Sequence, residues 1–88
     1  MFPEIDASMT REELAAATKA VDSRLVALGG GAYAGLGFKL KALKAAGFDD
    51  RGPPASPARL AAYARLARVL DAQGEAATMD SVIAALAA

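Results

Sequence analysis

The chain has 88 residues, with ten Lys and Arg against ten Asp and Glu, 55% hydrophobic residues, and no cysteine or histidine. The missing residue types exclude disulfide frameworks, zinc fingers, thiol nucleophiles and Ser-His catalytic triads. Zero net charge argues against a protein that coats nucleic acid through general basicity. The length predicts one small domain over residues 1–88, and because of the missing residue types we expect that this domain is not an enzyme and binds no metal.

The first predicted helix covers residues 11–28. Thr10 and Glu13 have the spacing of a capping box, in which each side chain binds the backbone amide of the other. Apolar residues then follow at helical spacing on one narrow stripe: Leu14, Ala17, Val21, Leu25 and Leu28. Three consecutive glycines from Gly29 end the helix, because glycine adopts the left-handed C-cap conformation without strain.

The second predicted helix runs to residue 46 and carries two apolar lines on different faces. Its main line, expected in the core, contains Tyr33, Leu36, Leu40 and Leu43. Its second line contains Phe38, Ala42 and Ala45, which we predict as the surface for a partner. Gly35 and Gly37 each weaken a helix by about 1 kcal/mol relative to alanine, so the start is expected at either residue 32 or residue 37. The alternative is that the C-terminal helix, or Phe2–Ile5, covers the second line.

Two further helices are predicted after a loop stiffened by Pro53 and Pro54. Ser56 and Pro57 favour a helix start, with a serine N-cap and a proline in the first turn, and this third helix spans residues 57–73. Its core line contains Leu60, Tyr63, Leu66, Ala67 and Leu70. The last helix, 78–87, is short and needs docking for its stability. The predicted fold is therefore all-α, a small bundle of three longer helices plus a short C-terminal helix.

Charge is distributed unevenly along the chain. The segment 37–70 has seven basic and two acidic residues, a net of +5, and the two flanking segments are acidic. Either the acidic ends neutralise the basic middle within the fold, or the middle forms a basic face for an acidic partner. The acidic pairs Glu12-Glu13 and Asp49-Asp50 are expected to be solvated, because a metal or acid–base site needs more converging groups.

The segment 31–48 resembles the cofactor loop of the short-chain dehydrogenases, whose G-x-x-x-G-x-G spacing is matched by Gly31, Gly35 and Gly37. That resemblance implies glycine amides around a pyrophosphate at a helix N-terminus. The dehydrogenase fold needs a large parallel sheet that 88 residues cannot build, and the family's Tyr-x-x-x-Lys pair is missing at both Tyr33 and Tyr63. We therefore expect no cofactor.

The same segment also resembles the helix-hairpin-helix DNA-binding motif, through Gly35-Leu36-Gly37-Phe38-Lys39 and a closing Gly47. The resemblance implies that hairpin amides and the lysine grip phosphate oxygens without reading bases. With two arginines that we expect to point outward from the third helix, the phosphate-binding candidates are Gly35, Gly37, Lys39, Lys41, Lys44, Arg65 and Arg68.

Neither end of the chain carries a targeting pattern that changes these expectations. The first six residues lack the basic and apolar regions of a secretory signal, and no uncharged run approaches the roughly 20 apolar residues of a membrane span; we expect a cytoplasmic protein. The terminal Leu86-Ala87-Ala88 resembles the end of the tag that bacteria append to stalled chains, although chance accounts for it in so alanine-rich a sequence.

The leading functional hypothesis is a non-enzymatic helical binding module, an adaptor or regulator that acts through protein–protein contacts or as a homo-oligomer. The alternative is a protein that binds the nucleic-acid backbone through Gly35–Lys39 and the basic residues around it. The two differ in salt dependence, which is steep only for phosphate binding.

Overall fold

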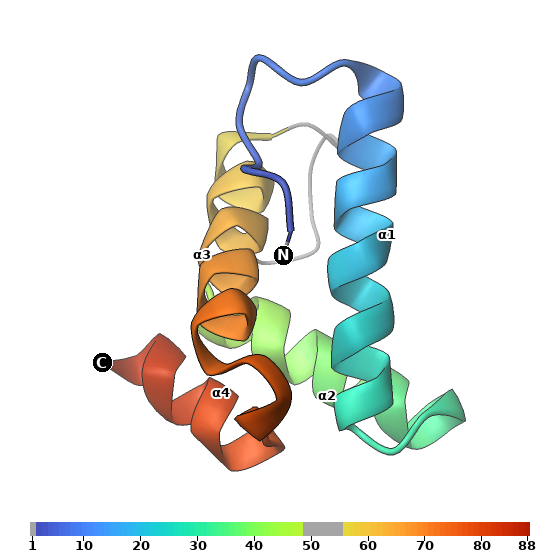
Figure 1. The fold of residues 1–88 in the computed structure, drawn as a ribbon, viewed down its shortest axis with the longest axis vertical. Helices are drawn as coiled ribbons and strands as arrows, with labels where there is room; N and C mark the ends of the chain where they lie inside the picture. The colour runs from blue at the N-terminus through green and yellow to red at the C-terminus, as the bar shows by residue number, and fades with distance from the viewer. Residues whose placement is uncertain (1, 49–55) are drawn as a thin grey trace.

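The computed structural model describes residues 2–48 and 56–88. These residues form four α-helices and no strand: α1 (Arg11–Leu28), α2 (Ala32–Ala45), α3 (Pro57–Gln73) and α4 (Met79–Ala87), with a short 3₁₀ turn, η1 (Gly74–Ala76), between the last two. The all-α expectation is confirmed. Figure 1 shows α1 and α3 running in the same direction, with α2 crossing behind their lower ends and α4 at the base.

Side-chain caps fix three of the four helix starts. The Thr10 hydroxyl accepts a hydrogen bond from the Glu13 amide at 3.1 Å, and the Glu13 carboxylate accepts one from the Thr10 amide at 2.9 Å, so the predicted capping box is present. Ser56 caps α3 in the same way through the Arg59 amide. Thr78 and Ser81 form a capping box at α4 that was not predicted from the sequence.

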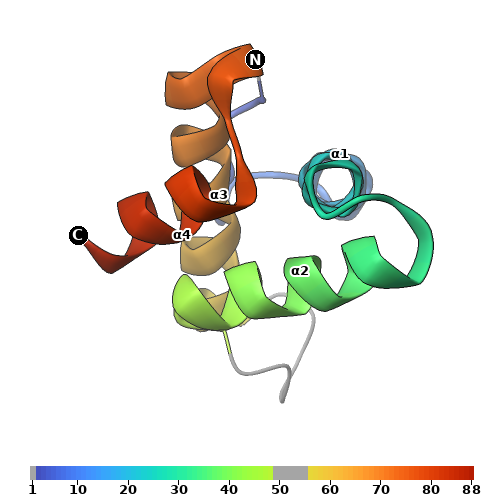
Figure 2. The ribbon, with the colours of Figure 1, turned by 90° about the horizontal axis from the view of Figure 1, so that it is seen from below.

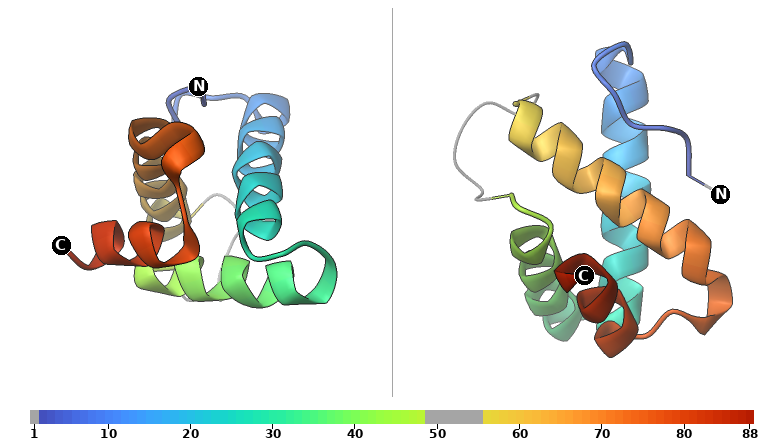
Figure 3. Two further views of the ribbon diagram at one scale, coloured as in Figure 1. Left: turned by 60° about the horizontal axis from the view of Figure 1, so that its bottom comes forward. Right: turned by 90° about the vertical axis from the view of Figure 1, so that its left-hand side faces the viewer.

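The core is built by side chains from all four helices and from the N-terminal segment. Its largest fully buried side chains are Leu25, Leu66, Val21 and Val82. Ile5 is also buried, because the N-terminal segment lies against α3 before the chain enters α1 (Figure 3). α4 packs against both α2 and α3, which provides the docking that a helix of 9 residues needs.

The predicted assignment of the two faces of α2 is wrong. Phe38 is 7% exposed and Ala42 is fully buried, whereas Tyr33, Leu36 and Leu40 lie on the solvent side. Of the main line, only Leu43 is buried. α2 therefore turns toward the core the face that was expected to meet a partner. The sequence offered the C-terminal helix or Phe2–Ile5 as a cover for that face, and the C-terminal helix, α4, packs against α2.

The reason for this orientation is the close approach of α2 to α1. A Cβ atom on Gly35 would lie 2.2 Å from the Val26 carbonyl oxygen, and one on Gly29 would lie 2.7 Å from the Phe38 Cβ. Gly35, Phe38 and Ala42 share one helix face, since they are three and four residues apart. This face of α2 has a glycine, Gly35, at the point where the α1 backbone comes closest. Figure 2 looks along α1 and shows α2 passing directly beside it.

Candidate functional site

Three large apolar side chains lie in a row on the outer face of α2. Tyr33 is 91% exposed, Leu36 44% and Leu40 54%, and their spacing of three and four residues places them on one side of the helix. Gly37 lies beside them, and apart from its chain neighbours and the backbone of its own helix no described atom lies within 4 Å of where its Cβ would be. We call Tyr33, Leu36 and Leu40 the α2 stripe. Of the partner-binding candidates predicted from the sequence, Phe38 and Ala42 are buried and Ala45 is exposed.

The basic residues of α2 differ in their surroundings. The Nζ of Lys39 lies 3.9 Å from the Oδ2 of Asp22 on α1, and both side chains are about one-quarter exposed. Lys41 and Lys44 are exposed, and neither forms an ion pair within residues 2–48 and 56–88. The helix contains no acidic residue. Within the part of the chain that the structure describes, the α2 stripe is therefore bordered by two exposed lysines without an ion-pair partner.

Asp22 also anchors a polar cluster between α1 and α3. The Tyr63 hydroxyl donates a 2.7 Å hydrogen bond to Asp22 Oδ1, and the Arg59 guanidinium lies 4.7 Å from the Tyr63 ring centroid. Burial, reinforced by the Asp22 carboxylate, raises the pKa of Tyr63 well above its usual value of 10.0. Tyr63 is therefore a protonated hydrogen-bond donor at neutral pH, which suits it to holding α1 and α3 together.

The hairpin implied by the helix-hairpin-helix resemblance does not form. Gly35 to Lys39 lie inside α2, where the Gly35 amide donates to the Gly31 carbonyl at 2.9 Å. The chain turns earlier, through Gly29 to Gly31, and the backbone of Gly30 and Gly31 has the positive φ that favours glycine. Amides engaged within a helix are not available to bind phosphate oxygens in the way the motif requires.

The remaining phosphate-binding candidates are scattered and only partly free. Arg65 does not point into solvent as expected: it is half-buried and donates to the carbonyls of Ala46, at 3.3 Å, and Leu86, at 2.8 Å. These carbonyls lie at the C-terminal ends of α2 and α4, where a cation is electrostatically favoured. Arg68 is exposed, as predicted. Asp49 and Asp50 lie outside the described residues.

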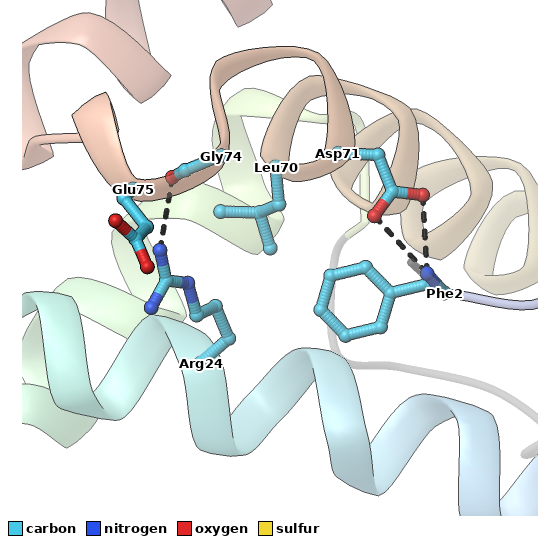
Figure 4. Close-up of a pocket in the computed structure, with 6 residues that line it drawn as sticks. All are labelled: Phe2, Arg24, Leu70, Asp71, Gly74 and Glu75. Atoms are coloured by element: carbon cyan, nitrogen blue, oxygen red, sulfur yellow. Dashed lines mark hydrogen bonds between the residues drawn. The ribbon is translucent and has the colours of Figure 1, made fainter.

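A shallow pocket beside the N-terminal segment was not predicted from the sequence. It has a volume of about 460 Å³ and is lined by Phe2, Arg24, Leu70, Asp71, Gly74 and Glu75. Figure 4 shows the Phe2 ring pointing toward Leu70 while its backbone amide donates to both Asp71 carboxylate oxygens, at 3.0 and 3.1 Å. These contacts join residues 69 positions apart, which no local sequence pattern reports.

Among the residues that the structure describes, no group of three or more acidic side chains is positioned to hold a metal ion. No helix within that part of the chain has the length and apolarity needed to cross a membrane. Comparisons of the chain with protein-family models, curated proteins and solved structures gave no match. The candidate site is thus defined by exposure and chemistry: the α2 stripe, with Lys41 and Lys44 beside it.

Proposed function

We propose that this protein is a non-enzymatic helical binding module that contacts another protein through the α2 stripe. The observation that carries the proposal is the exposure of Tyr33, Leu36 and Leu40 in one row. Burying a leucine or an aromatic side chain contributes roughly 1.5–3 kcal/mol. Contiguous apolar rows on small monomers are characteristic of interaction surfaces.

The surroundings of the polar side chains support binding rather than catalysis. Tyr63 is held protonated against Asp22 in the interior, and Arg65 is occupied by two helix-terminal carbonyls. Both side chains join helices to one another. The phosphate-binding alternative is left with Lys41, Lys44 and Arg68, spread over two helices, because Lys39 pairs with Asp22. A phosphate backbone would also leave Leu36 and Leu40 exposed.

Site-specific photo-crosslinking tests the proposal while the partner is still unidentified. A photoreactive amino acid replaces Leu40 in one variant and Ala20 in another; both positions are exposed, and Ala20 lies on α1. Each variant is expressed in the cells that naturally contain the protein. We expect a discrete protein adduct, resistant to nuclease, from position 40 and not from position 20.

Two results would contradict protein docking on α2. One is the same adduct pattern, or no adduct, from both positions. The other is an adduct that disappears with nuclease, which would identify nucleic acid on this face. Circular dichroism of both variants establishes that the helices are intact, since neither side chain belongs to the core.

A further inference from the structure

We propose that the partner presents an acidic amphipathic helix to α2, with apolar residues on the α2 stripe and carboxylates against Lys41 and Lys44. This inference rests on the proposed function and specifies the chemistry of the partner. It draws on three features of α2: its charge, the spacing of the stripe and the space at Gly37.

The charge of α2 has one sign. The helix contains Lys39, Lys41 and Lys44 and no acidic residue. Among the residues 2–48 and 56–88, Lys39 is the lysine of this helix that has a carboxylate beside it, that of Asp22. Lys44 lies one helical turn beyond Leu40 and continues the line of the stripe, while Lys41 lies one turn beyond Gly37 on its flank. A partner that covers the stripe therefore meets two exposed ammonium groups, which complementary carboxylates would both steer and hold in register.

The shape of the stripe suits a helix. Tyr33 to Leu40 spans about 10 Å along the axis, or two turns, and the three side chains lie on one side of the helix. Gly37 lies next to this row and has no side chain, and a Cβ there would meet open space. A side chain of the partner therefore has room at this position, in the manner of a knob entering a hole. A partner helix of two to three turns would match this length.

The same charges disfavour the other occupants. Pairing the outer faces of two copies of α2 would bring four lysines into one interface with no acid on either helix, and like charges at an interface are repulsive. Nucleic acid would satisfy Lys41 and Lys44, but its phosphate backbone offers no apolar surface to Leu36 and Leu40.

Two synthetic peptides test the charge prediction directly. Both have about 18 residues, enough for measurable helix formation, and share the same leucine stripe, but the flanking positions are glutamate in one and lysine in the other. Fluorescence anisotropy measures their affinity for the full chain at low and at high salt. We expect the acidic peptide to bind about tenfold more tightly and to lose that advantage as salt rises.

Charge reversal on the protein provides the matched control. In Lys41→Glu/Lys44→Glu the preference should invert toward the lysine peptide. In Arg11→Glu/Lys19→Glu, an equal charge reversal at exposed positions of α1, the preference should persist. Equal affinities of both peptides for the wild type, a preference for the lysine peptide, or an unchanged preference in Lys41→Glu/Lys44→Glu would overturn the acidic-helix inference.

The remaining outcomes separate this inference from the proposed function. A nuclease-resistant adduct from position 40 together with no binding of either peptide would retain protein docking and remove the acidic helix. If neither the adduct nor peptide binding is found, both protein docking on α2 and the acidic-helix inference are removed. If sedimentation shows a wild-type dimer that the Leu40→Asp substitution dissociates, a second copy of the chain is the occupant. If a short DNA duplex displaces the acidic peptide, nucleic acid is the occupant. Either result overturns the acidic-helix inference.

Discussion

At the scale of single residues, the two glycines inside α2 have different physical roles. Gly35 is buried, with Val26 of α1 in the position where its side chain would be, whereas a Cβ on Gly37 would meet open space. Helix propensity alone treats the two alike, at about 1 kcal/mol each relative to alanine. The difference comes from packing and is visible only once α1 is in place.

Alanine substitution should separate the two glycines. Gly37→Ala adds a methyl group to solvent and should stabilise the protein by about 0.5–1 kcal/mol. Gly35→Ala forces the α1 and α2 backbones apart, because its methyl would lie 2.2 Å from the Val26 carbonyl oxygen, and should cost about 1–3 kcal/mol or more. Urea unfolding monitored by circular dichroism measures both. Equal effects of the two substitutions would show that the helices do not approach at Gly35.

Tyr63 gives stability a dependence on alkaline pH. Folding raises the pKa of Tyr63 above the unfolded value of 10.0, so its contribution is complete below about pH 10. It declines as pH rises from there toward the folded pKa, since the unfolded state releases the proton first. Tyr63→Phe should lower stability by about 1–2 kcal/mol at neutral pH and lose this alkaline decline. Denaturation curves of both proteins between neutral pH and pH 11 test this; parallel pH profiles would refute it.

At the scale of elements, the orientation of α2 decides which residues are core and which are surface. Tyr33, Leu36 and Leu40 belong to the main apolar line of the helix, which is why the prediction from sequence placed them in the interior. The structure instead buries the face that contains Gly35 and Ala42, because small residues permit close helix packing. The spacing of Gly35 and Ala42, seven residues apart on one face, is a usable signal for this contact. In the sequence alone, the same residues also fit a hairpin and a partner surface.

Lysine substitutions on the two faces of α2 test this orientation. Phe38→Lys would bury an unpaired ammonium group at a position that is 7% exposed and should cost several kcal/mol. Leu40→Lys, two residues along the same helix, enters solvent and should change stability by no more than about 0.5 kcal/mol. Thermal melts with light scattering distinguish the two. If Leu40→Lys were the more destabilising variant, the sequence-based orientation would be restored.

At the scale of the whole molecule, predictability from sequence decreases with the distance along the chain between contacting residues. Local signals located the helices, since the Thr10 capping box and the Ser56-Pro57 start are both present. Contacts between distant segments were missed: Phe2 with Asp71, Tyr63 with Asp22, and Arg65 with the carbonyls of Ala46 and Leu86. Each depends on how helices are placed in space, which caps and periodicity do not encode.

Arg65 illustrates how one such contact stabilises the assembled fold. Its guanidinium binds Ala46 at the end of α2 and Leu86 near the end of α4, so it satisfies carbonyls that a helix leaves unpaired and places positive charge where the helix dipoles are negative. α4 has 9 residues and would not persist alone. The link from α3 through Arg65 therefore helps to hold the C-terminal helix on the bundle.

Alanine variants of Arg65 and its neighbour Arg68 should differ clearly. Arg65→Ala should lower the free energy of unfolding by about 1.5–3 kcal/mol, the range for a hydrogen bond that involves a charged group, and should speed hydrogen exchange of the amides of α4. Arg68→Ala removes an exposed arginine and should stay within about 0.5 kcal/mol of the wild type, with α4 still protected. Hydrogen exchange followed by NMR resolves the α4 amides individually. Equal protection of α4 in the two variants would show that Arg65 does not couple α3 to the C-terminal helix.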